Sequence, residues 1–170
     1  LENQAHRAMV VLDPVKLGLT NWAEVFGSAD HLEACALPAL PHAAEGEVVP
    51  ERRFTLGREV WIEREDFAEV PPPGFKRLTV GGDVRLRGAG ILRCDEAVKD
   101  ADGRVAELRC TLDPESRPGM EGANRKVKGT IHWVSAQHAV AAEIRLYDRL
   151  FSVEKPDDEA DGRTYRDHLN

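Results

Sequence analysis

Basic side chains gather in the middle of the sequence, where their type and spacing suit an anionic partner. Lys76 and Arg77 are adjacent, and Arg85 and Arg87 follow with one residue between them. An arginine presents a planar fork of donors that pairs with a phosphate or a base edge, and lysine adds a compact positive charge. On a rigid strand, such groups can read unstacked RNA bases. The cluster predicts an RNA-contacting surface. The alternative is a solvated sheet face whose arginines pair with carboxylates.

A second basic stretch contains Lys126 and Lys128, which alternate with Val127 and Gly129 before Trp133. In an extended strand the two lysines would project from one face, where they suit a phosphate backbone. The glycine would allow a close approach, and the tryptophan would lie on the opposite, apolar face. The alternative interpretation makes the lysines plain solubilising groups over a core tryptophan.

Other reactive side chains point to no catalytic or metal chemistry in this chain. Ser135 and His138 lie three residues apart in an expected turn, without the strand-to-helix elbow of a nucleophile. The spacing of His132 and His138, with or without Cys94, is a weak metal pattern. The sequence contains neither a GxxxxGK[ST] phosphate loop nor a GxGxxG fingerprint. We therefore predict no catalytic residue, no metal ligand and no cofactor site.

Hydrophobic residues recur mostly with a period of two, which is typical of strands with one buried face. The alternating runs are Val15 to Leu19, Val60 to Ile62, Val84 to Leu86, Leu108 to Leu112, Val127 to Trp133 and Ile144 to Leu146. Turn signals separate them at residues 81–82, 100–103 and 135–138. Many short antiparallel strands predict an all-β barrel or sandwich.

Two local predictions concern the segments beside the basic residues. A three-residue loop at 81–83 would form a hairpin that opposes Val80 to Val84 and Leu78 to Leu86. This register keeps the arginines on one face of the hairpin. Residues 27–50 are rich in Ala, Glu and Pro, which indicates a surface loop or insertion with a helical turn near residues 31–37.

Composition and charge narrow the class of protein. The chain has 170 residues and 42% hydrophobic residues, enough for one ordinary domain or two small ones. Its net charge of −7 excludes a uniformly basic nucleic-acid binder, although not a local basic surface. The three cysteines are an odd number without paired metal spacing, which argues against a disulfide framework and against a CxxC zinc site. No apolar run approaches the roughly 18 residues of a membrane span, so we expect a cytoplasmic protein without membrane contact. Because the chain starts at Leu1, we expect it to be a piece of a longer protein.

Five sequence blocks resemble the C-terminal anticodon-binding region of bacterial glutaminyl-tRNA synthetases, in the order found in that family. They are RAMVVLDPVKL at 7–17, FKRL at 75–78, VRLR at 84–87, RKVKGTIHWVS at 125–135 and EIRLYDRLF at 143–151. The resemblance implies two antiparallel β-barrels of the type shared with a ribosomal protein. The first barrel would cover residues 5–130, with the loop insertion around 27–50. Residues 131–170 would begin a second, truncated barrel.

The resemblance also implies roles for single residues. By position, Arg7 matches an arginine at the middle anticodon base, and Lys76 and Arg77 match a basic pair near the third base. Arg85 and Arg87 match arginines around the first base and its backbone. Separately, the basic stretch at Lys126 and Lys128 could contact the tRNA backbone. Gly74 stands where the family often has glutamine, so a side-chain contact is missing or replaced there.

The function implied by the resemblance is anticodon recognition within a glutamine–tRNA ligase. The partner would be glutamine tRNA, the protein would be a monomer, and ATP would bind in a catalytic domain outside this chain. The chain alone would then be inactive. Two alternatives stay open: the same domain of a related glutamyl-tRNA synthetase, and a stand-alone, ribosome-associated RNA-binding barrel. A protein-interaction domain that uses the acidic segment at 24–51 is a weaker third.

Overall fold

The computed structural model describes residues 8–40, 48–156 and 162–170. These residues divide into two compact units, Leu1–Val140 and Ala141–Asn170. Strands dominate the first unit, and the prediction of an all-β, barrel-like fold is confirmed. No helix among the described residues is long and apolar enough to cross a membrane.

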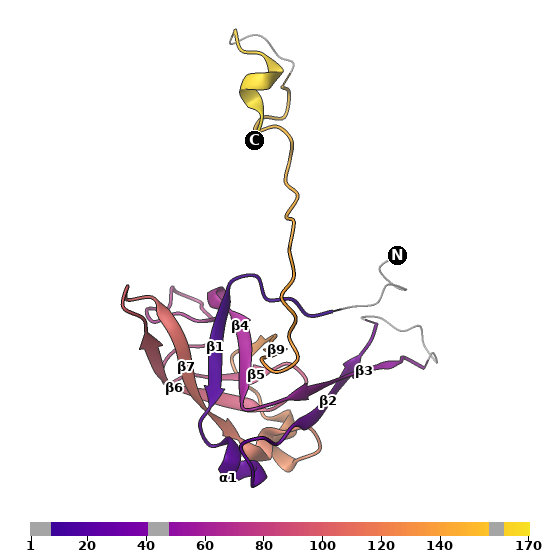
Figure 1. Cartoon of the computed structure of the whole chain (residues 1–170), viewed down its shortest axis with the longest axis vertical. Helices are drawn as coiled ribbons and strands as arrows, with labels where there is room; N and C mark the ends of the chain where they lie inside the picture. Colours follow the sequence, from indigo (N-terminus) through magenta and orange to yellow (C-terminus); the bar gives the residue numbers. More distant parts are fainter. Residues whose placement is uncertain (1–7, 41–47, 157–161) are drawn as a thin grey trace. The chain divides into compact units, whose positions relative to one another are not determined.

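The first unit is built on a seven-stranded sheet in the order β8-β5-β6-β7-β1-β4-β9. In Figure 1, β1 of this sheet lies between β7 and β4. Neighbouring strands are antiparallel except for the pairs β1–β7 and β5–β8, which are parallel. The strands are β1 (Pro14–Leu19), β4 (Glu59–Glu63), β5 (Asp83–Leu86), β6 (Ile91–Lys99), β7 (Val105–Asp113), β8 (Thr130–Ile131) and β9 (Val134–Ser135).

The alternating residues fill the core as predicted for the four strands with a clear period of two. Leu17, Val60, Leu86 and Leu108 are fully buried, and polar residues between them face outward. Trp133 is also fully buried, and its indole N–H donates to the carbonyl oxygen of Arg87 at 3.1 Å. This bond anchors the end of β5 to the core.

All three cysteines are buried and reduced. Cys94 on β6 faces Cys110 on β7 across the antiparallel ladder. Cys35 lies on a separate two-stranded sheet formed by β2 (Glu33–Pro38) and β3 (Glu51–Leu56). Burial raises the pKa of the Cys35 thiol to about 11.

The two-stranded sheet corrects the prediction of a helical turn near residues 31–37. Glu33 to Pro38 are extended and pair in register with β3, with Cys35 opposite Phe54. Pairing with a strand more than ten residues away in the chain overrides the local helix propensity of the Ala- and Glu-rich stretch. The short helix in this region lies earlier, at α1 (Trp22–Phe26), and ends at Gly27 with a φ of 76°.

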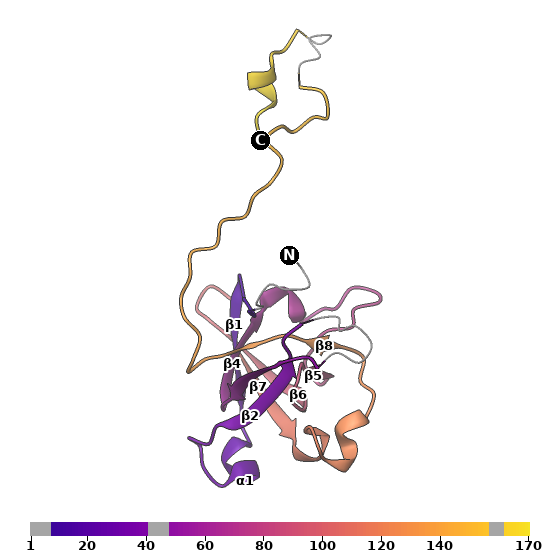
Figure 2. The same cartoon turned by 90° about the vertical axis from the view of Figure 1, so that its right-hand side faces the viewer.

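The predicted hairpin at residues 78–86 is wrong. Leu78 is buried, but it forms a parallel bridge with Phe67, and Val80 bridges Cys94. Gly82 N–H donates to the Thr79 carbonyl oxygen at 2.9 Å, so the chain turns here and β5 then runs antiparallel to β6. Contacts with distant segments therefore replace the local pairing. Figure 2 shows β5 between β6 and β8.

Two further predicted strands differ in the structure. Lys126 and Lys128 lie in irregular chain before β8, and residues 141–149 contain no strand. At Gly129, a Cβ atom would overlap the carbonyl oxygen of Lys76. The backbone of the irregular segment thus packs against the backbone at Lys76. The close approach predicted for this glycine is to the chain itself.

The second unit, Ala141–Asn170, has a 3₁₀ turn at Tyr165–His168 and one bridge between Phe151 and Leu169. Ser152 N–H donates to the His168 carbonyl oxygen, and Asn170 N–H donates to that of Leu150. Whether the chain divides into barrels at residue 131 stays a prediction.

Candidate nucleic-acid interface

Four of the predicted basic residues line two hollows in the first unit: Arg77, Arg85, Arg87 and Lys126. We call them the Arg85 hollow, whose lining includes Arg85, Met120, Asn124, Arg125, Lys126 and Thr130, and the Arg77 hollow, whose lining includes Asp66, Arg77, Arg87, Thr130 and His132. Thr130 on β8 belongs to both. Their volumes of about 860 and 480 Å³ lie within the range of sites that hold small molecules or single groups of larger ones.

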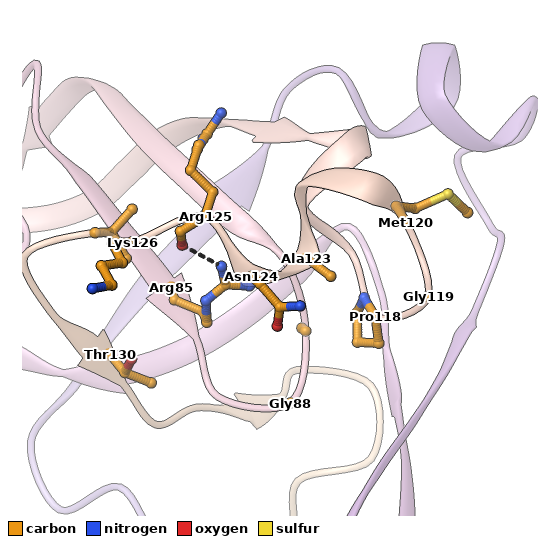
Figure 3. Close-up of a pocket in the computed structure, with 12 residues that line it drawn as sticks. Arg85, Gly88, Pro118, Gly119, Met120, Ala123, Asn124, Arg125, Lys126 and Thr130 are labelled. Carbon is orange, nitrogen blue, oxygen red and sulfur yellow. Dashed lines mark hydrogen bonds between the residues drawn. The ribbon is translucent and has the colours of Figure 1, made fainter.

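In the Arg85 hollow, the arginine is held by backbone carbonyl groups. Val84 and Leu86 point into the core, so Arg85 between them points to the other face of β5. Its guanidinium donates to the carbonyl oxygen of Ser116 at 3.1 Å and to that of Arg125 at 2.8 Å (Figure 3). The half-buried side chain is therefore fixed by carbonyl groups, and no carboxylate of the described residues pairs with it.

Ser116 explains why one of these carbonyl groups is well placed. The serine is fully buried at the end of the 3₁₀ turn Pro114–Ser116. Its hydroxyl donates to the Asp113 carbonyl oxygen at 2.6 Å and accepts from the Ile91 N–H at 2.7 Å. These two hydrogen bonds, to β7 and β6, connect the turn to the sheet that carries Arg85.

Arg125 at the same hollow is neutralised in part. Its guanidinium lies 2.6 Å from a carboxylate oxygen of Asp113. Lys126 is exposed and has no ion-pair partner among the described residues. Arg85 and Lys126 thus leave this hollow with positive charge available to an anion.

In the Arg77 hollow, a buried carboxylate holds the arginine. Arg77 Nε lies 3.1 Å from Asp66 Oδ1, and Nη1 donates to the Thr130 carbonyl oxygen at 2.9 Å. The Asp66 side chain is only 8% exposed, whereas that of Arg77 is 48% exposed. Burial raises the pKa of the Asp66 carboxyl group, and the Arg77 guanidinium acts in the opposite direction.

Arg87 reaches the Arg77 hollow from the end of β5, where its backbone N–H donates to the Ile131 carbonyl oxygen. The structure therefore brings Arg77 and Arg87 together, as the sequence predicts, but through β8 and not through a hairpin. The exposed side chains of Arg87, Lys76 and Lys128 have no ion-pair partner in the described part of the chain. Among the predicted basic residues at 76–87 and 128, only Arg77 pairs with a carboxylate of the described residues, as the alternative of a solvated, neutralised face would require. The others are Lys76, Arg85, Arg87 and Lys128.

Several predicted positions add nothing to this geometry. Arg7 lies outside the described residues. Gly74 is exposed with a φ of 80°, a left-handed conformation that favours glycine over the glutamine expected there. His138 Nδ1 is 2.8 Å from the Thr55 hydroxyl oxygen, and the His138 backbone N–H donates to the Ser135 carbonyl oxygen at 3.3 Å, as in a hydrogen-bonded turn. Within residues 8–40, 48–156 and 162–170, no group of three His, Cys, Asp or Glu side chains could hold a metal ion.

The groups that orient the arginines were missed by the sequence-based reasoning. Asp66 ends a charged triplet with Arg64 and Glu65, which is typical of solvated surface. The anchors of Arg85 are backbone carbonyl groups, which every residue possesses. Of these residues only Arg125 carried a signal, as a member of the second basic stretch.

Comparison with known proteins assigns the family. The family described as tRNA synthetases class I (E and Q), anti-codon binding domain, matches residues 5–113, and a second model of the same description matches residues 130–169. The chain is 64% identical over its whole length to the glutamine–tRNA ligase of Xanthomonas euvesicatoria, and 61% to that of Xylella fastidiosa. It spans 28% of the length of each relative. The resemblance first seen in the five sequence blocks is confirmed, and the chain belongs to the anticodon-binding domains of the class I glutamyl- and glutaminyl-tRNA synthetases.

Proposed function

We propose that this chain is the anticodon-recognition region of a glutamine–tRNA ligase and that it binds the anticodon loop of glutamine tRNA. The similarity to glutamine–tRNA ligases over the full chain supports glutamine over glutamate as the amino acid of the parent enzyme. That enzyme would use ATP, bound outside this chain, to attach glutamine to its tRNA. The chain alone would be inactive, and the parent would be a cytoplasmic monomer.

One observation carries the proposal: the guanidinium groups of Arg85 and Arg77 are held by neighbouring carbonyl and carboxylate oxygens and still have free donors. Arginine has five N–H donors. Arg85 uses two of them in hydrogen bonds to backbone carbonyl groups, and Arg77 has one such hydrogen bond and an ion pair with Asp66. The remaining donors can pair with phosphate oxygens or with the edges of bases that are splayed out of the loop. Fixed side chains lose little further freedom on binding, which favours affinity.

The residues take the roles implied by the family resemblance. Lys76 and Arg77 would lie near the third anticodon base, and Arg85 and Arg87 near the first base and its backbone. Arg7 would contact the middle base. Lys126 and Lys128 would meet the phosphate backbone. Residues 5–130 would form the first barrel, and residues 131–170 would begin the second.

Such a region contributes to aminoacylation through binding energy. Correct anticodon contacts favour the docking in which the tRNA acceptor end meets the catalytic domain. The proposal therefore predicts that substitutions of these arginines weaken tRNA binding more than they affect the activation of glutamine by ATP.

The test is the binding of glutamine tRNA to the full-length protein with Arg87→Ala or Arg85→Ala. We expect affinity to fall roughly tenfold in each, because a charge-assisted contact is lost. Arg53→Ala is the matched control, since Arg53 is an exposed arginine on β3 and its removal changes the net charge equally. Unchanged affinity in both arginine variants of the hollows would contradict the proposal.

Aminoacylation with glutamine and with glutamate, measured side by side, tests the identity of the amino acid. Charging with glutamine supports the ligase assignment, and charging with glutamate would move the chain to the glutamyl enzyme. Light scattering of the full-length protein tests the monomeric state.

A further inference from the structure

Asp66 is an unusual residue to find beside an RNA-binding surface, because it adds a negative charge there. It ends the 3₁₀ turn Arg64–Asp66 and is 5% exposed. A buried carboxylate costs solvation free energy, and a buried ion pair often contributes no net stability compared with apolar residues. Stability alone therefore does not account for this carboxylate.

The backbone around Asp66 places its side chain next to Arg77. Leu78 N–H donates to the Asp66 carbonyl oxygen at 2.9 Å, and Ala68 N–H donates to the Leu78 carbonyl oxygen at 3.1 Å. Leu78 is itself fully buried. The residue before Leu78 is therefore held beside the turn, and the two side chains meet at 3.1 Å.

The guanidinium of Arg77 then has two anchors on different elements. Asp66 holds Nε from the turn, and the Thr130 carbonyl oxygen holds Nη1 from β8. Two fixed points on a planar group determine the direction of its remaining N–H donors. Nearly half of the side chain stays exposed, so these donors are accessible to a ligand in the hollow shared with Arg87.

We propose that Asp66 is a positioning residue for RNA binding: its buried carboxylate, together with the Thr130 carbonyl group, aims the free donors of Arg77 into the hollow that Arg87 also lines. The proposal rests on the proposed function, since it assumes that Arg77 contacts the anticodon loop. Asp66 itself does not touch the RNA. Its contribution is the orientation of a neighbour.

The positioning role predicts the opposite sign from simple electrostatics. Removing a negative charge near a polyanion strengthens binding if charge alone matters. We expect Asp66→Asn instead to weaken binding of glutamine tRNA to the full-length protein roughly tenfold, at constant salt, because the ion pair that orients Arg77 is lost. Glu65→Gln is the charge-matched comparison: Glu65 is exposed and lines the same hollow. We expect it to strengthen binding by about twofold or less.

A double-mutant cycle tests whether Asp66 acts through Arg77. Arg77→Ala weakens binding, and adding Asp66→Asn to it produces no further loss if the aspartate acts only through the arginine. A merely structural role of Asp66 would lower affinity in both backgrounds. Thermal unfolding of each variant identifies any that are not folded at the assay temperature.

Arg77→Lys tests the same idea without changing Asp66. Lysine keeps the positive charge but cannot span both anchors with a planar fork. We expect a loss close to that of Arg77→Ala, and wild-type affinity in this variant would overturn the proposal.

The outcomes separate the two hypotheses. If Arg77→Ala and Arg87→Ala both leave affinity unchanged, the proposed function fails at this hollow. If Arg77→Ala weakens binding while Asp66→Asn strengthens it as Glu65→Gln does, the function stands and the positioning role is wrong.

Discussion

The two hollows hold their arginines by different means. Arg85 is fixed by the carbonyl oxygens of Ser116 and Arg125, which are neutral and need no titratable group. Arg77 is fixed by one carbonyl oxygen and by the buried carboxylate of Asp66. Two similar side chains on one surface therefore depend on different conditions for their orientation.

The two kinds of anchor affect the charge of the arginine differently. Carbonyl anchors leave the full positive charge of Arg85 available to a phosphate. The carboxylate holds Arg77 through an ion pair at 3.1 Å, which also cancels much of its charge. The Arg85 hollow is therefore the more attractive to a phosphate backbone, and the Arg77 hollow the more suited to directional hydrogen bonds.

The largest expected effect comes from a change that disturbs both hollows. A Cβ atom in Gly129→Ala would overlap the Lys76 carbonyl oxygen, and the segment between Lys126 and Thr130 would have to move. We expect a loss of about 2–3 kcal/mol in the free energy of unfolding and weaker tRNA binding, measured by urea unfolding and by titration. Gly18→Ala on β1 is the control, because its Cβ would meet its nearest neighbour at 3.7 Å. Equal stability of the two variants would contradict this packing.

Arg85→Ala should disturb the Arg85 hollow and leave the Arg77 hollow unchanged. Two backbone carbonyl groups lose their donor, and we expect the free energy of unfolding to fall by about 1–2 kcal/mol. Arg77→Ala, which leaves Asp66 buried without its partner, is the comparison, and hydrogen exchange at Arg125 and Thr130 locates each effect. The comparison fails if Arg85→Ala loosens β8 as much as Arg77→Ala does.

Lys126→Ala and Lys128→Ala should have smaller effects that depend on salt. Both side chains are exposed and lie outside the strands, so we expect no change in stability. If each meets one phosphate, the slope of log affinity against log salt falls by about one for each lysine removed. Titrations at several salt concentrations measure this slope. An unchanged slope would remove these lysines from the interface.

The smallest expected effect is a pH dependence confined to the Arg77 hollow. The pKa of Asp66 is raised in the folded chain, so over the pH range just above 3.8 the folded chain holds a proton that the unfolded chain releases. The free energy of unfolding contributed by this group therefore falls as pH rises through that range. Urea unfolding from about pH 4 to about pH 7 should show a steeper decline for the wild type than for Asp66→Asn. Arg85→Ala should decline as the wild type does.

Strands could be predicted from the sequence where one face of the strand is buried and the other is not, because apolar and polar residues then alternate. Val15, Val60, Val84 and Leu108 begin alternating runs that the structure confirms as strands. The prediction of a hairpin at 78–86 was wrong because Leu78 bridges Phe67, earlier in the chain, and Val80 bridges Cys94, later in the chain. Such pairings depend on the whole sheet and leave no local pattern.

The candidate site was predictable only in part for a related physical reason. The donors are charged side chains, which the sequence displays directly. Their orientation depends on backbone carbonyl groups of Ser116, Arg125 and Thr130 and on one aspartate in a charged triplet. Apart from Arg125, which belongs to the second basic stretch, none of these residues has a sequence feature that marks it as an anchor, so only the folded chain identifies them. The role of the donors themselves stays a prediction until binding is measured.

The three buried thiols can be used to measure local opening of the structure by chemical labelling. An alkylating reagent modifies a thiol only when the surrounding structure opens, so its rate measures the frequency of that opening. Cys35 would report on the two-stranded sheet, and Cys94 with Cys110 on the centre of the seven-stranded sheet. Labelling rates in the presence and absence of tRNA would then show which of the two sheets opens less often once RNA is bound, without any introduced probe.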